Sequence, residues 1–380
     1  MEERIFTARR LAAALCAWAA MVFAPASPGH AAQCKPPSVL MILPDRPDNP
    51  FWGPYADFAA SVADSLGIPL TVEYTVENDR FDYMERLQRS LSGSEKPDYI
   101  AVFPYLGAVP LLMQEASRSG TQIVTLNADL GQGDREAVGY PRERYKNWIL
   151  QSLADDESAG FDLARAVTDA ARARFGLSES ETVRLSAIGG NQLAAASLLR
   201  RDGLVRFAGG AAAPVSINQF VFTDWSYERG SEVAAGLLRR YQPTHAVWTA
   251  SLPLGLAAVD AWTAAAGPAM PAIGVVSGPF DERALAGIDG GTFSAVLGGH
   301  FFEGGILLVL LLDHFNGLDF VDDIGTGLRI PFETVDKGNI ADVRAVLGDR
   351  VWRGRNFAHL SKCHDAARRY YDFSMRTVLR

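Results

Sequence analysis

The sequence is poor in the features that mark enzymes and nucleic-acid-binding proteins. It has three cysteines and six histidines among 380 residues, and its formal net charge of -8 argues against nucleic acid or an anionic membrane surface as a partner. It contains no G-x-S-x-G elbow, P-loop, G-x-G-x-x-G or H-E-x-x-H motif. No helix-turn-helix precedes Ser38, which argues against a transcription repressor. We therefore expect neither an enzyme nor a cofactor.

Long apolar runs are absent beyond the first part of the chain. Residues 11–25 form one apolar run, which follows Arg9 and Arg10 and precedes the small-residue segment Ala26–Ala32. This order is typical of a secretory signal, so we expect residues 1–32 to be removed on export. The run is too short to span a bilayer, and no later run approaches about 20 apolar residues. The sequence predicts an exported, soluble mature protein.

Cysteine is scarce, but two cysteines lie at the ends of the mature chain. Cys16 lies within the predicted signal, whereas Cys34 and Cys363 remain after its removal. In an oxidising compartment these two can form one disulfide, and two free thiols are the alternative. His359 and His364 flank Cys363, but no further Cys or His nearby completes a metal site.

From Ser38 onward, short apolar runs alternate with longer helical stretches. The predicted strands are Val39–Leu43, Leu70–Thr75, Tyr99–Phe103, Ile123–Leu126, Val183–Ile188, Phe220–Thr223, Ala246–Thr249, Ile273–Val276 and Thr292–Leu297. The predicted helices are Tyr55–Ser65, Tyr83–Ser90, Val109–Ser117, Ser158–Arg174, Leu193–Phe207, Tyr227–Tyr241, Leu254–Ala265 and Phe302–Phe315. This alternation is typical of parallel sheets covered by helices on both faces, and nine strands suit two α/β domains.

The first predicted strand ends in a loop that holds an amide and two large rings: Asn49, Phe51 and Trp52. Open α/β proteins bind small ligands at the carboxyl ends of their strands. An amide can hydrogen-bond a polar ligand, and a flat ring can pack against it. Two alternatives stay open. The first is that Phe51 or Trp52 is a core residue of the first helix, and the second is that Asn49 is only a helix cap.

Short segments along the chain resemble the type I periplasmic substrate-binding proteins of the ribose- and galactose-binding kind, whose cousins are the autoinducer-binding receptors. The segments are Asn49–Trp52, Tyr99–Pro104, Ile123–Asn127, Asp155–Gly160, Ala246–Ser251, Ile273–Gly274 and Phe332–Asn339. Their order and spacing carry the resemblance, which covers most of Ser38–Phe357. It implies an α/β fold of the periplasmic binding protein-like I class, with two Rossmann-like lobes, parallel sheets and a three-crossing hinge.

The resemblance also implies where the two lobes divide. The crossings are expected near Leu153–Asp155, Gly298–His300 and Ile330–Phe332. The N-terminal lobe would then be Ser38–Ala154 plus Gly299–Ile330, and the C-terminal lobe Asp155–Gly298 plus Pro331–Arg380.

Further ligand-binding candidates follow from the resemblance. Asn127 stands where the family often has a ligand-binding Asp, and Ala128 where it often has Arg. Arg200 lies one turn beyond the position of another family Arg, so we expect it to be a scaffold residue. Asp155 and Asp156 either bind the ligand or cap the next helix. The full predicted set is Asn49, Phe51, Trp52, Asn127, Asp155, Asp156, Asn191, Gln192, Ser251, Ser277 and His300. Because charged groups of sugar binders are replaced here, we expect a neutral ligand or one that is not an ordinary pentose.

The resemblance implies a monomeric periplasmic solute-binding protein that captures a small polar, sugar-like ligand between its lobes for the permease of an ABC importer. The alternative is a sensor of the same fold that presents its closed state to a membrane sensor kinase or chemoreceptor. The sequence does not separate these two roles, and it does not identify the ligand.

Overall fold

The computed structural model describes residues 34–49, 51–75, 79–105, 107–192, 194–210, 214–265, 269–277, 281–347 and 352–380. The predicted signal, residues 1–32, and Pro50 of the first loop lie outside the described residues. Among the described helices, none combines the length and the apolar character that a membrane crossing requires. Cys34 and Cys363 form a disulfide, which confirms the predicted bridge.

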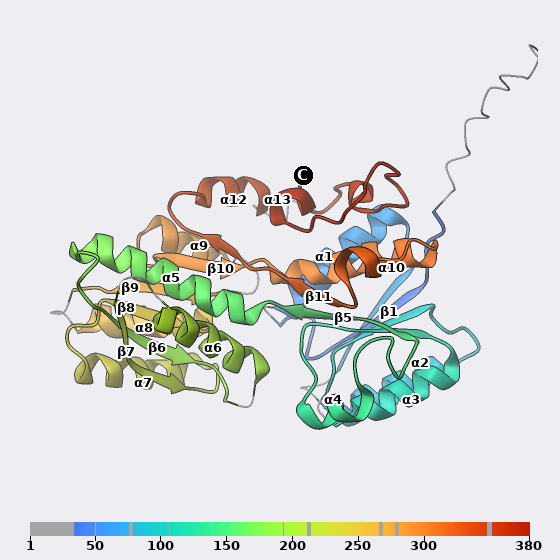
Figure 1. The fold of residues 1–380 in the computed structure, drawn as a ribbon, viewed down its shortest axis with the longest axis horizontal. Helices are drawn as coiled ribbons and strands as arrows, with labels where there is room; N and C mark the ends of the chain where they lie inside the picture. Colours follow the sequence, from blue (N-terminus) through green and yellow to red (C-terminus); the bar gives the residue numbers. More distant parts are fainter. Residues whose placement is uncertain are drawn as a thin grey trace, which may run out of the picture. The chain divides into compact units, whose positions relative to one another are not determined.

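The first sheet has six parallel strands in the order β11-β5-β4-β3-β1-β2. They are β1 (Val39–Leu43), β2 (Leu70–Tyr74), β3 (Tyr99–Val102), β4 (Gln122–Thr125), β5 (Trp148–Ala154) and β11 (Gly327–Ile330). Figure 1 labels β1, β5 and β11 of this sheet. The helices connected to them are α1 (Trp52–Leu66), α2 (Arg80–Ser92), α3 (Val109–Ser119), α4 (Gln132–Val138), α10 (Glu303–Phe315) and α11 (Val321–Ile324). All of β1 is buried, as expected for a strand with both faces covered. Leu40 and Ile42 pack in one core with Tyr83 of α2 and Leu112 of α3.

The second sheet has the order β12-β10-β9-β8-β6-β7, and only β12 runs antiparallel to its neighbour. Its strands are β6 (Val183–Gly189), β7 (Val215–Phe222), β8 (Ala246–Thr249), β9 (Ala272–Val276), β10 (Ala295–Gly298) and β12 (Glu333–Val335). The helices connected to them are α5 (Asp156–Phe175), α6 (Ala195–Gly210), α7 (Tyr227–Arg240), α8 (Leu252–Ala264), α9 (Glu282–Asp289) and α12 (Ile340–Leu347). Together the two sheets confirm the predicted α/β class with mostly parallel strands.

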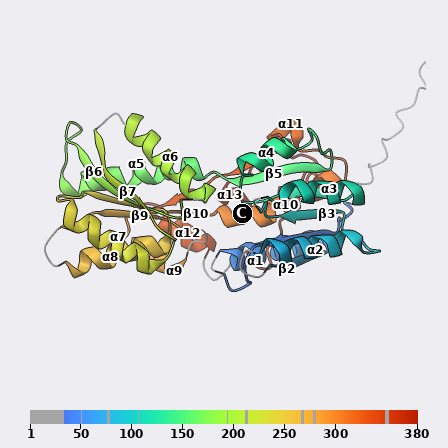
Figure 2. The same cartoon turned by 90° about the horizontal axis from the view of Figure 1, so that it is seen from below.

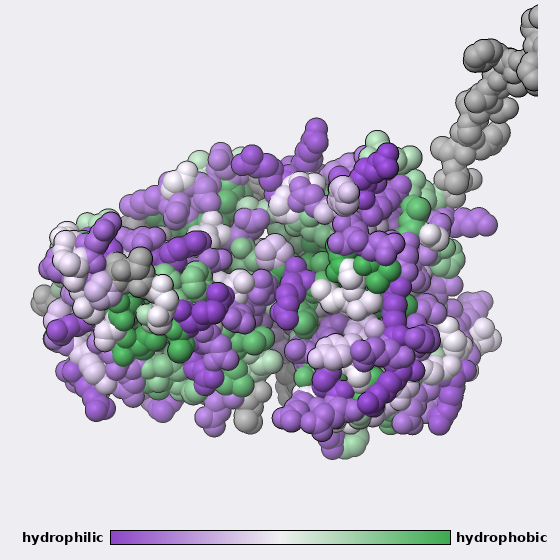
Figure 3. Space-filling model, in the orientation of Figure 1, coloured by the Kyte–Doolittle hydropathy of each residue, from purple (hydrophilic) through white to green (hydrophobic). Residues whose placement is uncertain are grey.

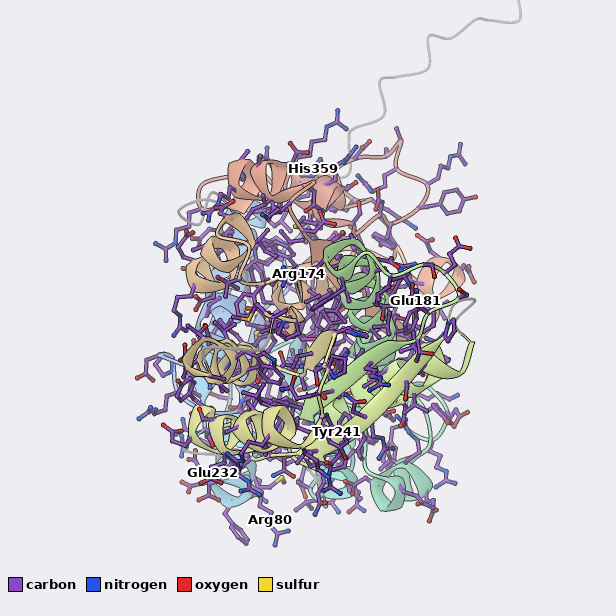
Figure 4. The ribbon with its side chains drawn as sticks, turned by 90° about the vertical axis from the view of Figure 1, so that its left-hand side faces the viewer. Arg80, Arg174, Glu181, Glu232, Tyr241 and His359 are labelled. Atoms are coloured by element: carbon purple, nitrogen blue, oxygen red, sulfur yellow. The ribbon has the colours of Figure 1, made fainter. Side chains whose placement is uncertain are left out.

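Helices cover both faces of the second sheet: α5 and α6 lie on one face, and α7, α8 and α9 on the other (Figure 2). Two glycines let α5 and α6 approach closely. A Cβ on Gly160 would lie 1.9 Å from the Arg200 carbonyl oxygen, and a Cβ on Gly203 would lie 1.9 Å from that of Glu157. Arg174, labelled in Figure 4, ties the end of α5 to the loop before β9 by donating to the Pro271 carbonyl oxygen at 2.5 Å.

The chain passes from one sheet to the other three times. It crosses after β5, after β10 and after β11, which are the places given by the family resemblance. At the first crossing the Asp155 N–H donates to the Ile330 carbonyl oxygen at 2.9 Å, so the first and third crossings lie side by side. The division into two hinged lobes stays a prediction.

The C-terminal segment Trp352–Arg380, which includes α13 (Met375–Val378), packs mainly on α1 and α10. Trp352 Nε1 donates to Asp57 Oδ2 at 3.1 Å, and the Phe357 N–H donates to Ser65 Oγ at 2.7 Å. Both contacts go to α1, a helix of the first sheet, whereas the predicted boundary assigns residues 331–380 to the second lobe. The assignment of this segment to a lobe stays a prediction.

The face in Figure 3 is mostly hydrophilic, with smaller hydrophobic patches between the polar side chains. The large apolar side chains that are most exposed among the described residues are Phe81, Tyr140, Val205 and Tyr370. They come from separate elements, so no one element presents an extended apolar face by itself.

Candidate ligand-binding site

A cavity of about 390 Å³ lies at the carboxyl ends of the first-sheet strands. Its walls include Phe103 and Asn127 after β3 and β4, Asp156 at the start of α5, Ala195 at the start of α6, and Arg329 of β11. Small-molecule sites have volumes of about 300–1,000 Å³ and favour the carboxyl ends of parallel strands. The position and size of this cavity therefore suit a small ligand.

A larger groove of about 800 Å³ runs along α5, but it lies at the opposite end of the second sheet. It is lined by Arg174 near the end of α5, by Phe293 just before β10 and by Lys337 after β12. These residues surround the amino ends of the parallel strands, where open α/β proteins do not place their ligands. The smaller cavity is therefore the better candidate site.

Asn127 follows the carboxyl end of β4, and a buried carboxyl group fixes its position. Its backbone is left-handed, with a φ of 61°. Its N–H donates to Glu303 Oε1 at 2.9 Å and its Nδ2 donates to Glu303 Oε2 at 3.0 Å. Asn127 Oδ1 has no hydrogen bond with any described residue, so this cavity-lining side chain keeps an acceptor for a ligand.

Glu303 opens α10 and is fully buried. Burial raises the pKa of Glu303, while the hydrogen bonds that its carboxyl group accepts from Asn127 act in the opposite direction. The two oxygens of the Glu303 carboxyl group each accept from one of the two donors of Asn127. Glu303 therefore connects the ligand-facing loop after β4 to the helix that follows the second crossing.

Asp156 and Arg200 form a buried ion pair beside the cavity. Arg200 Nε and Nη2 both lie 2.7 Å from Asp156 Oδ1, and Arg200 Nη1 donates to the Ala250 carbonyl oxygen at 2.7 Å. Only 7% of the Asp156 side chain and 10% of the Arg200 side chain are exposed. Burial raises the pKa of Asp156, and the charge of Arg200 opposes this effect. This geometry agrees with the scaffold role expected for Arg200, and it uses one oxygen of Asp156 inside the protein.

His300 is stacked between two phenylalanines at the crossings. Its ring centroid lies 4.8 Å from that of Phe51 and 4.1 Å from that of Phe332, with interplanar angles of 25° and 29°. It is 5% exposed, and its Nδ1 has no hydrogen-bond partner among the described residues. Burial, and then the charge of Arg200, hold the pKa of His300 well below its usual value. The imidazole is therefore neutral in the folded protein.

This neutral histidine predicts a loss of stability in acid. The unfolded chain protonates His300 at its ordinary pKa near 6.5, so the unfolded state binds more protons than the folded state below that pH. This group should lower the free energy of unfolding by up to about 1.4 kcal/mol per pH unit as the pH falls below 6.5. His300→Phe keeps a ring in the stack, so the variant should lose less stability between pH 7 and pH 5. Urea unfolding at pH 7, 6 and 5 tests this, and parallel declines for the two proteins would contradict it.

The side chains of the first loop make contacts within the protein. Asn49 Oδ1 accepts from the N–H groups of Phe51 and Trp52 at 2.8 and 3.0 Å, so it caps α1, which is the alternative left open by the sequence. Trp52 is 8% exposed, and its ring packs 5.2 Å from Tyr55 and 5.9 Å from Phe103. The indole is not part of the cavity wall. Phe103 supplies the ring there, and Trp52 packs against it.

The remaining predicted residues take several positions outside the cavity wall. Asp155 Oδ1 accepts from the Ser158 N–H at 3.4 Å and so caps α5. Ser251 precedes α8, and its Oγ has no hydrogen bond among the described residues. Ser277 is buried after β9. Asn191 and Gln192 follow β6 in the loop before α6. The structure places Asn127 and Asp156 together in the cavity wall, and a ligand contact stays a prediction for every residue of the predicted set.

Three residues around the cavity were missing from the predicted set: Phe103, Glu303 and Arg329. Phe103 ends a predicted strand and Arg329 directly precedes the third expected crossing, so both positions carried a signal. Glu303 lies 176 positions from its partner Asn127, and no local pattern indicates that its carboxylate points inward.

No family model matches this chain, and no curated protein matches it. Solved structures do match. A periplasmic sugar-binding protein from Pseudomonas fluorescens is 26% identical, with a TM-score of 0.75 over 90% of this chain and all of that one. An ABC transporter periplasmic solute-binding protein from Actinobacillus succinogenes with bound D-allose is 17% identical, with a TM-score of 0.64 over 80% and 99% of the two chains. An ABC transporter solute-binding protein from Bacillus halodurans with bound myo-inositol is 14% identical, with a TM-score of 0.62 over 82% and 98%.

These matches confirm the resemblance to the type I periplasmic substrate-binding proteins. The chain has their fold over most of its length. The matched proteins are described as binding proteins, and the expectation that this chain is not an enzyme agrees with them.

Proposed function

We propose that the chain is a periplasmic solute-binding protein that holds a small polar, sugar-like ligand between two lobes and delivers it to the permease of an ABC importer. The observation that supports this proposal is the cavity at the strand ends, whose walls come from elements of both sheets. The structural neighbours support a solute-binding role of this kind.

In this proposal, the three crossings act as a hinge and the ligand stabilises the closed arrangement of the lobes. Asn127 Oδ1 accepts a hydrogen bond from a ligand hydroxyl, and Phe103 provides an apolar surface for the carbon skeleton. The stack of Phe51, His300 and Phe332 lies at the crossings and supports the hinge. Micromolar binding needs a net free energy of about -8 kcal/mol, which a few such contacts can supply.

A ligand screen tests the proposal. The mature chain is heated with sugars, sugar acids, polyols, nucleosides and amino acids, and its melting temperature is followed. A bound ligand stabilises in proportion to the logarithm of its excess over the dissociation constant, so one class should give a saturable increase. If no class raises the melting temperature and calorimetry with the same compounds shows no binding, the proposal fails.

Asn127→Gly should weaken binding of the best compound from this screen roughly tenfold, which corresponds to a lost hydrogen bond of about 1.4 kcal/mol. Glycine tolerates the left-handed backbone at this position, so the variant removes the amide without adding strain. Gln114→Ala, on the exposed side of α3, is the matched control. Titration calorimetry measures both variants. Equal dissociation constants for Asn127→Gly and the control would show that Asn127 does not bind the ligand.

A further inference from the structure

The carboxylates in the cavity wall are already paired with arginines. Asp156 is paired with Arg200, as described above. Asp129 Oδ1 accepts from Arg135 Nη2 at 2.6 Å, and Glu157 Oε1 lies 2.9 Å from Arg206 Nε. None of the three partner arginines belongs to the cavity wall. Each carboxylate of the cavity wall is thus paired with an arginine that lies outside the wall.

Arg329 is the one charged residue of the cavity wall that has no charge partner in the described part of the chain. It lines the same cavity, and its guanidinium makes no hydrogen bond or ion pair with any described residue. In the sheet it lies opposite Leu153 of β5, so it stands next to both the first and the third crossing. Its side chain is exposed, whereas Leu328 and Ile330 on either side of it are buried. Because successive side chains of a strand point to opposite faces, β11 places Arg329 on its exposed face.

The carboxylates of the cavity wall are paired, whereas Arg329 has no partner among the described residues. The cavity therefore carries an excess positive charge. A planar guanidinium binds a carboxylate through two parallel hydrogen bonds, and one guanidinium balances one negative charge. Asn127 Oδ1 accepts from a hydroxyl, and Phe103 covers carbon atoms, which suits the rest of a sugar. We propose that the ligand is a sugar acid with a single carboxylate, and that Arg329 binds this carboxylate.

This inference rests on the proposed function, because it names the ligand class for the same cavity. The sequence left two alternatives, a neutral ligand or one that is not an ordinary pentose, because the lost family arginine near Asn127 suggested a less charged site. A sugar acid belongs to the second alternative. Arg329 supplies a cation from the edge strand β11, at a position that the family resemblance did not indicate.

Matched pairs of compounds test the inference on the mature protein: D-glucuronate with D-glucose, D-galacturonate with D-galactose, and D-ribonate with D-ribose. Titration calorimetry should give tighter binding for one acid than for its neutral partner. Arg329→Gln should weaken that acid roughly 10- to 100-fold, as expected for a lost charge-assisted contact, and leave the neutral partner within about threefold. Arg283→Gln, an exposed arginine of α9 that is paired with Asp281, is the control and should change neither.

The outcomes separate this inference from the proposed function. Preference for an acid, lost in Arg329→Gln and kept in Arg283→Gln, supports both. A neutral sugar that binds as tightly as its acid, or an acid unaffected by Arg329→Gln, overturns the sugar-acid inference. The proposed function then survives if Asn127→Gly still weakens the neutral sugar. Absence of saturable binding for all six compounds overturns the sugar-acid inference, while the broader screen above decides the proposed function.

Discussion

Asp156→Ala should lower the free energy of unfolding by about 3–5 kcal/mol. The substitution leaves the guanidinium of Arg200 buried without its carboxylate, and removal of one partner of a buried ion pair carries a cost of this size. The pair also joins the start of α5 to α6, which pack closely through Gly160 and Gly203. Urea unfolding at pH 7 measures the change.

A double substitution separates the lost charge partner from the lost packing. Asp156→Ala combined with Arg200→Met removes both charges, so it should recover a large part of the stability lost by Asp156→Ala alone. Asp162→Ala, in an exposed surface pair of the same helix, should cost less than about 1 kcal/mol. If Asp156→Ala costs no more than Asp162→Ala, the pair does not stabilise the contact between α5 and α6.

Asp313→Ala should destabilise the protein by a similar amount, roughly 3–5 kcal/mol, because it removes the acceptor that holds the C-terminal segment. Asp313 of α10 is fully buried. It accepts from Ser361 Oγ at 2.5 Å, from the N–H groups of Lys362 and Cys363 at 2.8 and 2.9 Å, and from the Tyr371 hydroxyl at 2.9 Å. Burial, and then the nearby carboxylate of Asp313, raise the pKa of Tyr371. Without Asp313 these donors lose their partner.

Urea unfolding without reductant measures the effect of Asp313→Ala while the disulfide of Cys363 stays closed. Limited proteolysis should also show faster cleavage within residues 352–380, since local release of this segment becomes easier. Asp322→Ala, at an exposed position of α11, is the matched control. Equal stability and equal cleavage rates for the two variants would show that Asp313 does not hold the segment.

The sequence predicted the centres of both sheets because their strands are continuous apolar runs. The run Val39–Leu43 is buried at every position, and this pattern has few explanations other than a covered parallel strand. The edge strands β11 and β12 were not predicted. They have four and three residues, and polar side chains interrupt them, so they lack such a run. The strand β5 was also missed, because Gln151 and Ser152 interrupt its apolar pattern.

The candidate site was predictable in part for the same reason. Asn127 follows a recognisable strand, so its place at the carboxyl edge of the sheet could be deduced. Its fixed orientation depends on Glu303, and the direction of Trp52 depends on packing against Tyr55 and Phe103. Contacts of this kind join distant segments, and local periodicity does not encode them. Arg329 stood in a short edge strand that was not recognised, so its position in the cavity wall was missed.

We expect above all that a small polar ligand binds in the cavity bordered by Asn127, Phe103 and Arg329. A crystal structure of the mature chain with the tightest compound from the ligand screen tests it most directly. We expect electron density for the compound in this cavity, with a hydroxyl within hydrogen-bond distance of Asn127 Oδ1. Density in the groove beside Arg174 and Lys337, with this cavity empty, would contradict it.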